Sequence, residues 1–166
     1  RGQFYNTFKK RWSKGEVGDT FNVAISVQIV FDNYKCGNLD TSKKAMIEAE
    51  SILSRMKERD NIFMYEFYLL DKALFYVQSK DIDQAKKAFD DAFNLSVKVK
   101  SSSIQKVILE ERLNANIDTA EDKLKMYEAL DLLTEKEITA TKRITKKETI
   151  KRKHELEISE NKKKTH

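Results

Sequence analysis

A pattern that occurs three times along the chain limits its fold more than any other feature of the sequence. The central copy, residues 80–95, is KDIDQAKKAFDDAFNL, and related segments occupy residues 39–52 and 117–130. In each copy a small residue is followed four positions later by a large apolar residue, and three positions after that by another apolar residue. These triplets are Ser42, Met46 and Ala49, then Ala85, Phe89 and Ala92, then Ala120, Leu124 and Tyr127. Spacings of four and three place each triplet on one helical face, and repetition at about 35 to 45 residues predicts an array of helical hairpins.

The helices expected around these segments follow from the same periodicity. An Ile or Leu and an Asp open each copy, and Asp40, Asp83 and Asp118 are predicted to cap the helices that follow. Residues 21–35 contain several β-branched residues, but their length favours a buried helix over a strand. The other predicted elements are a helix at 3–13 carrying Phe4, Phe8 and Trp12, a loop at 13–19, and helices at 40–58, 62–79, 82–99, 103–116 and 119–136, with 59–61 as a link.

The central unit resembles the tetratricopeptide repeat (TPR) family. Leu69, Ala73 and Tyr76 match the large, small and aromatic positions of the first helix of such a repeat, and Ala85, Phe89 and Ala92 match the second helix. Lys72 and Val97 depart from the pattern, because Leu and Pro are usual there, and the flanking units carry Val30 and Ile108 at the small position and Asn33 and Glu111 at the aromatic one. The resemblance covers roughly residues 20–137. A generic bundle of amphipathic helices is the alternative.

The predicted fold is therefore all-α. The resemblance implies a right-handed superhelix of about three antiparallel helical hairpins, with an N-terminal helix and a long basic C-terminal helix. We expect an N-terminal helix and loop at 1–18, the repeat domain at 19–137, and the basic helix at 138–166, frayed from about Ser159. The absence of proline and the presence of only four glycines favour long helices with short connections.

The composition excludes several classes of protein. The chain is 40% hydrophobic and 36% charged, as expected for a helical domain with a real core rather than a disordered chain. No apolar run is long enough to span a bilayer, and the first residues lack the apolar core of a signal peptide. Cys36 is the only cysteine, which favours a reducing compartment. A cytoplasmic protein without membrane association is expected.

The resemblance to TPR arrays also implies a binding surface. In such arrays the first helices of the hairpins line a concave groove. The corresponding positions here are largely apolar and have few polar side chains: Val27, Phe31, Tyr34, Phe67, Leu70, Leu74, Val77, Gln78, Gln105, Leu109, Arg112 and Leu113. Such a groove suits an amphipathic helix or an extended apolar peptide, with Arg112 or a Gln setting its orientation. The alternative is that these side chains are ordinary core, covered by the C-terminal helix.

Catalysis is poorly supported by the sequence. The two histidines, His154 and His166, lie in the basic tail, and Cys36 has no companion that would complete a zinc site. No glycine-rich phosphate loop is present. Adjacent carboxylates such as Asp90–Asp91 and Glu110–Glu111 are expected to be solvated or paired with Lys, because neighbours on a helix point about 100° apart. A non-enzymatic protein without cofactor or metal is predicted.

The C-terminal segment has a second candidate surface. Its basic residues are Lys142, Arg143, Lys146, Lys147, Lys151, Arg152 and Lys153. On a helix they form a ridge that could follow nucleic-acid phosphates, although Glu148, Glu155, Glu157 and Glu160 dilute the charge and no aromatic residue is present for base stacking. A solvated capping helix and a coiled-coil strand are the alternatives.

Three functions remain open on the sequence alone. The first is a non-catalytic binding scaffold or receptor module that holds a protein or peptide in the apolar groove. The second is an accessory protein of nucleic acid or ribonucleoprotein that binds through the basic helix. The third is a structural subunit of a homo-oligomer, with its apolar faces buried between copies.

Overall fold

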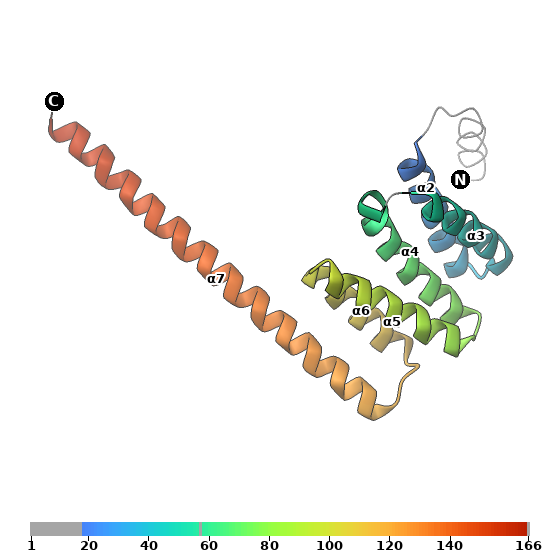
Figure 1. Ribbon diagram of the computed structural model, residues 1–166. Helices are drawn as coiled ribbons and strands as arrows, with labels where there is room; N and C mark the ends of the chain where they lie inside the picture. The colour runs from blue at the N-terminus through green and yellow to red at the C-terminus, as the bar shows by residue number, and fades with distance from the viewer. Residues whose placement is uncertain (1–17, 57, 166) are drawn as a thin grey trace. The chain divides into compact units, whose positions relative to one another are not determined.

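The computed structural model describes residues 18–56 and 58–165, and within them it contains α-helices and no strand. The helices are α2 (Asp19–Lys35), α3 (Leu39–Arg55), α4 (Glu58–Gln78), α5 (Ile82–Lys98), α6 (Ser102–Ala115) and α7 (Ala120–Lys164) (Figure 1). The all-α prediction is confirmed. The helix predicted at 3–13 and most of the loop after it lie outside the described residues.

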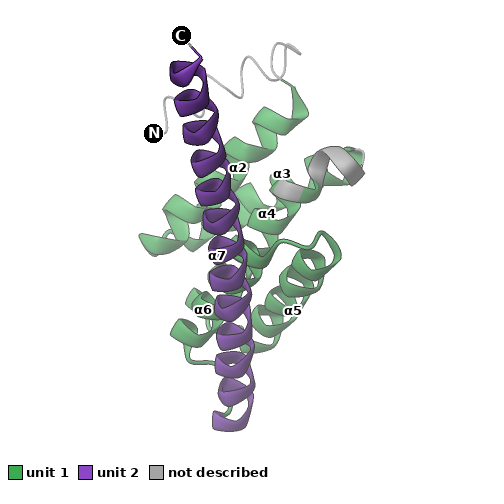
Figure 2. Cartoon of the chain, turned by 90° about the vertical axis from the view of Figure 1, so that its left-hand side faces the viewer, with its two compact units in different colours: residues 1–119 green, residues 120–166 purple. Residues whose placement is uncertain are grey.

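The chain divides into two compact units, which Figure 2 distinguishes by colour. Unit 1 comprises Arg1–Thr119 and contains α2 to α6; unit 2, Ala120–His166, is the single helix α7. The segments predicted as separate helices at 119–136 and 138–166 are thus one continuous helix, which extends through Ser159 to Lys164. No glycine or proline interrupts this stretch, and the helix has no local reason to end. The predicted pairing of residues 119–136 with α6 stays a prediction.

Within unit 1, α4 is the central helix. It packs against α2, α3, α5 and α6, while α2 also packs against α3 and α5 against α6. The sequence predicted this central position from the apolar character of residues 62–79. Residues 59–61, predicted as a link, instead belong to the first turn of α4.

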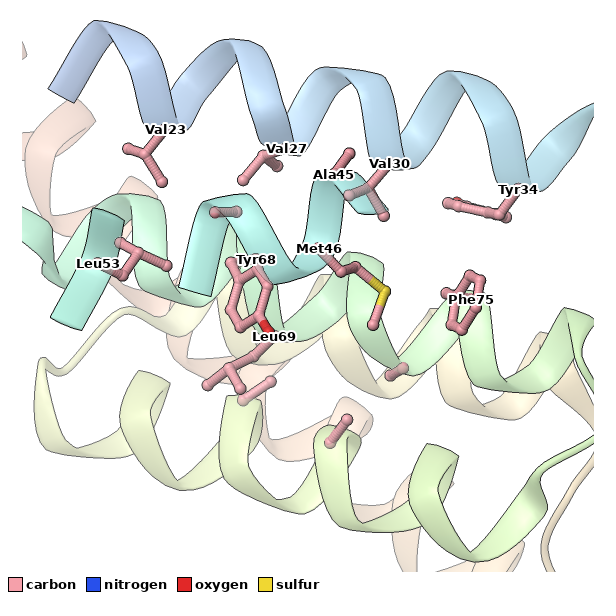
Figure 3. Packing of buried hydrophobic residues seen from close by; sticks show 14 of the residues in the cluster. Val23, Val27, Val30, Tyr34, Ala45, Met46, Leu53, Tyr68, Leu69 and Phe75 are labelled. Atoms are coloured by element: carbon pink, nitrogen blue, oxygen red, sulfur yellow. The ribbon is translucent and has the colours of Figure 1, made fainter. Parts of the chain in front are cut away.

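The core of unit 1 confirms the first two repeated triplets. Ser42, Met46 and Ala49 on α3 and Ala85, Phe89 and Ala92 on α5 are all buried. From α2, the side chains of Val23, Val27, Val30 and Tyr34 project toward α3 and α4 (Figure 3). Residues 21–35 are therefore helical despite their β-branched content, because one side of the helix is buried along its whole length.

Three connections in unit 1 have the same turn geometry. After α2, α4 and α5 a residue adopts a left-handed conformation: Gly37 (φ 76°), Lys80 (φ 62°) and Lys100 (φ 56°). The next residue donates its backbone N–H to a carbonyl five positions earlier: Asn38 to Asn33, Asp81 to Tyr76, and Ser101 to Ser96, each at 2.9 Å. This is the Schellman arrangement, which satisfies carbonyls left free at a helix end.

The same turn corrects the predicted helix caps. The residue that closes each Schellman turn is also the N-cap of the following helix: Asn38 for α3, Asp81 for α5, Ser101 for α6. Asp40 and Asp83, predicted as caps, therefore lie inside the first turn. Asp81 makes the side-chain cap on α5, accepting the Gln84 backbone N–H at 3.4 Å. Each connection needs only three residues; α3 and α6 begin one residue earlier than predicted, whereas α5 begins at residue 82 as predicted.

The burial of Phe89 predicts a large difference between two equivalent substitutions. Phe89 is 0% exposed, whereas Phe67 is 41% exposed. Phe89→Ala should lower the free energy of unfolding by about 3–5 kcal/mol, and Phe67→Ala by less than about 1 kcal/mol. Urea unfolding followed by circular dichroism measures both. Equal losses for the two variants would contradict the packing described for α5.

Candidate functional site

A groove of about 380 Å³ lies on unit 1 along α2 and α4. Its lining is mostly apolar and comes from successive turns of the two helices, with one residue from α6: Ala24, Val27, Gln28, Phe31, Met64, Phe67, Leu70, Asp71, Leu74 and Glu111. The spacings of three and four within each helix explain why these side chains share one surface. Phe67, at 41% exposed, presents the largest apolar surface among the residues of this set.

The structure brings together part of the groove that the sequence predicted. Val27, Phe31, Phe67, Leu70 and Leu74 all line it. They come from α2 and α4, which pack against each other directly.

The remaining predicted groove residues lie elsewhere in unit 1. Tyr34 and Leu109 are buried, at 6% and 7% exposed, and the Tyr34 ring packs edge-on against Phe31 with ring centroids 5.7 Å apart. Gln105 donates from Nε2 to the Ser96 carbonyl at 3.3 Å. Val77 and Leu113 are partly buried, Gln78 is exposed, and none of the three lines the groove.

Arg112 on α6 does not line the groove; its side chain instead binds Asp90 on α5 and Asp118 in the segment after α6. Its Nε and Nη2 atoms each donate to Asp118 at 2.9 Å, and Nη1 donates to Asp90 at 2.7 Å. The guanidinium carbon also lies 5.8 Å from the centre of the Phe89 ring. The paired hydrogen bonds to Asp118, with those to Asp90, raise the pKa of Arg112 and outweigh the opposing effect of burial. Asp118, predicted as a cap, thus serves as an acceptor for this arginine.

Two acidic residues of the groove were not among the predicted site residues. Asp71 lies on α4 one turn after Phe67 and one turn before Leu74, and Glu111 comes from α6. Asp71 could have been identified as a candidate site residue from the sequence, because it is a charged residue within the apolar row of the most hydrophobic helix. For Glu111 the sequence predicted a solvated or Lys-paired carboxylate, because the contact between α4 and α6 was not known.

Asp71 has an unusual protonation equilibrium. The pKa of its carboxyl is raised from 3.8 to about 7, mainly by burial and to a smaller extent by the negative charge of Glu111, while the positive charge of Lys35 opposes the shift. Burial also raises the pKa of the neighbouring Tyr34 hydroxyl, with smaller contributions from the charges of Asp71 and Glu111. A carboxyl with a pKa near neutrality costs the fold free energy whenever it ionises.

Lys35, the cation whose charge lowers the pKa of Asp71, is in contact with an aromatic ring. The Lys35 Nζ atom lies 4.3 Å from the centre of the Phe31 ring, in a cation–π contact at the end of α2. Lys35 is exposed, so its ammonium group also keeps much of its hydration. It moderates the charge of Asp71 without forming a direct ion pair with it.

The predicted basic patch lies on α7. All seven of its Lys and Arg side chains are exposed. Lys142, Lys146 and Lys153 lie along one face together with Thr141, Thr145 and Thr149. At about 100° per residue, Arg143, Lys147 and Lys151 fall within the same half of the helix surface, and Arg152 falls opposite. The sequence-based grouping of these cations is therefore consistent with a continuous helix.

The described part of the chain holds no group of three or more His, Cys, Asp or Glu side chains arranged to bind a metal ion. Across residues 18–56 and 58–165, no helix is both long and apolar enough to cross a membrane.

Comparison of the chain with protein-family models, curated proteins and solved structures finds no match.

Arg112 and Asp118 should stabilise unit 1 far more than an exposed ion pair does. Their side chains are 15% and 2% exposed, whereas those of Arg55 and Asp19, 3.4 Å apart, are 56% and 48% exposed. Asp118→Asn removes the negative charge beside the partly buried guanidinium and replaces one of its two acceptor oxygens by an amide NH₂ group, and should cost about 2 kcal/mol. Asp19→Asn should cost less than about 0.5 kcal/mol. Urea unfolding of both variants checks this, and an Asp118→Asn protein as stable as the parent would be inconsistent with it.

The stability of unit 1 should change with pH through Asp71. Because its folded pKa is raised from 3.8 to about 7, the native state holds this proton more tightly than the unfolded chain. The stability that protonated Asp71 provides is complete below pH 3.8 and decreases as pH rises toward 7. Asp71→Asn cannot ionise, so its advantage over the parent should grow to about 1–3 kcal/mol at about pH 8.

Urea unfolding at several pH values between about 5 and 8 measures this difference. The exposed Asp91 on α5 provides a matched control, since Asp91→Asn should change stability little at any pH. A constant difference between Asp71→Asn and the parent across the range would show that Asp71 is not the titrating group.

Proposed function

We propose that unit 1 is a non-catalytic binding module that holds a helical or extended apolar segment of another protein in the groove along α2 and α4. The observation that carries this proposal is the groove itself: an apolar surface built from regularly spaced side chains of two adjacent helices, with Phe67 partly exposed. Burial of such side chains against a partner supplies the main favourable term in association. A helix with apolar residues at intervals of three and four fits a groove of this kind.

The proposal includes the assignment of unit 1 to a TPR-like array. Support comes from the pairing of α2 with α3 and of α4 with α5, and from the contact of the first helices α2 and α4 with each other. The buried small residues Ala73 and Ala85, at the positions where helices of such repeats cross, also support it.

A second candidate function concerns α7. Its exposed basic half could bind an acidic surface such as nucleic acid. Residues 138–166 carry ten Lys or Arg against four Glu, a net charge of +6. The four glutamates and the absence of aromatic side chains in this segment make it a weaker candidate than the groove.

Selection from a displayed library of random peptides tests the groove. Peptides recovered by the parent protein should bind Leu74→Asp at least about tenfold more weakly, because the new carboxylate would lose hydration beneath an apolar ligand. Ile47→Asp is the matched control: Ile47 lies on α3, outside the groove, and is 61% exposed. Affinities are measured by fluorescence anisotropy after circular dichroism shows that both variants are folded.

Either of two results would overturn the proposal. If the selection yields no peptide that binds the parent protein, the proposed binding function is wrong. Equal binding of the peptides by Leu74→Asp and the parent would place the contact elsewhere. Arg112 is unsuitable for this test, because its replacement would break the hydrogen bonds to Asp118 and Asp90.

A further inference from the structure

The ionisable residues of the groove are all acidic. Among its lining residues the only ionisable side chains are the two carboxyls of Asp71 and Glu111, and the rest, apart from Gln28, are apolar. They lie close enough for the charge of Glu111 to raise the pKa of Asp71, and both charges act on Tyr34. Within the described residues, no hydrogen bond or ion pair to a side chain neutralises either carboxylate.

The unpaired carboxyls have no evident role in stability. Ionised Asp71 is partly desolvated and repelled by Glu111, and Lys35 compensates it only at a distance. An apolar side chain at position 71 would extend the row of Phe67, Leu70 and Leu74 without this cost. An ionised group held at a cost in folding free energy is typical of a position that meets a ligand.

We propose that Asp71 and Glu111 bind a Lys or Arg side chain of the partner segment whose apolar residues occupy the groove. This inference rests on the proposed function and adds the chemistry of the partner. A cation placed between the carboxylates would replace mutual repulsion by two attractions, in a place where apolar neighbours weaken screening by water.

The position of Asp71 also defines the partner's sequence pattern. Asp71 follows Phe67 by one helical turn and precedes Leu74 by one turn, so apolar surface lies on both sides of the carboxyl along α4. The matching ligand is an amphipathic helix that carries Lys or Arg about one turn from an apolar residue on each side.

Three designed peptides test the charge preference. They form amphipathic helices of about four turns with the same apolar face of Leu and Phe, and differ only at the central position, which is Lys, Gln or Glu. Fluorescence anisotropy at low ionic strength should give the order Lys, then Gln, then Glu, with at least about a tenfold difference between the first and last.

Substitutions in the protein should change the Lys peptide's affinity in opposite directions. Asp71→Asn and Glu111→Gln should each weaken it by about threefold to tenfold and leave the Gln peptide almost unchanged. Lys35→Gln should strengthen the Lys peptide and weaken the Glu peptide, because it removes a positive charge that acts on Asp71. An order that reverses these signs would show that the groove prefers an acidic partner and would overturn the inference.

The pH dependence gives an independent readout. The raised pKa of Asp71, about 7, means that the carboxyl gains its charge between about pH 6 and 8. Glu111 on α6 and Lys35 on α2 are the ionisable groups whose charges act on it, and the charge of Asp71 in turn raises the pKa of Tyr34 on α2. The Lys peptide should bind more tightly at about pH 8 than at about pH 6, and Asp71→Asn should abolish that difference.

Failure of the inference and failure of the proposed function are distinguishable. Equal affinities for the three peptides, all lost in Leu74→Asp, would overturn the charge preference and leave the groove as a binding site. No binding of any peptide by the parent would overturn both. A dimer of the parent protein, seen by light scattering and lost in Leu74→Asp, would make a second copy of this chain the occupant and would also overturn the inference.

Discussion

The close approach of helices at small side chains is the constraint on which unit 1 depends. Ala49 on α3, Ala73 on α4, and Ala85 and Ala92 on α5 are all 0% exposed. Alanine at a helix crossing lets the two backbones approach, and larger residues on either side then fill the space between them. Phe89, also 0% exposed, is such a residue. The small residues therefore fix the helix spacing, and the large ones supply the buried apolar area that stabilises it.

The groove is a consequence of this packing. The apolar surface of α2 and α4 is wider than the surface that neighbouring helices cover, so some apolar side chains remain exposed. On α4, Leu69 and Ala73 face the core, while Phe67 and Leu74 lie in the neighbouring row. On α2, Val30 is fully buried while Phe31 remains half-buried at the groove. Phe31, Leu70 and Leu74 pack against the core but are only partly buried, so this row keeps apolar surface at the groove, and the carboxylate of Asp71 distinguishes it from ordinary core.

The helices of unit 1 could be predicted from the sequence because their causes are local. The repeated triplets, the absence of proline and the glycine at position 37 are visible along the chain. The turns at Lys80 and Lys100 adopt the same conformation as Gly37 without a glycine, and only their place in the repeat indicated them. The caps of α3 and α5 were predicted two residues too late, because one residue both closes each Schellman turn and caps the next helix.

The candidate site was harder to predict because it depends on contacts between distant segments. The apolar members of the groove share one helix face each, so periodicity found them. Arg112 has the same spacing, but two acceptors from outside α6, Asp90 and Asp118, bind its guanidinium. Helix periodicity predicts the face from which a side chain projects. The position of the charged group at the end of a long side chain also depends on the carboxylates that lie within its reach.

The same reasoning explains why the two acidic residues carry the most information about the proposed partner. Arg112 holds its two acceptors in a partly buried cluster in which a cation is hydrogen-bonded to opposite charges. Asp71 and Glu111 form the opposite arrangement: two partly buried carboxyls that repel each other, with Lys35 held on the Phe31 ring. The chain therefore contains both a charge cluster that is complete within unit 1 and one that a cation from outside would complete. The second lies in the groove, where the apolar lining would bring a partner's side chains into contact with it.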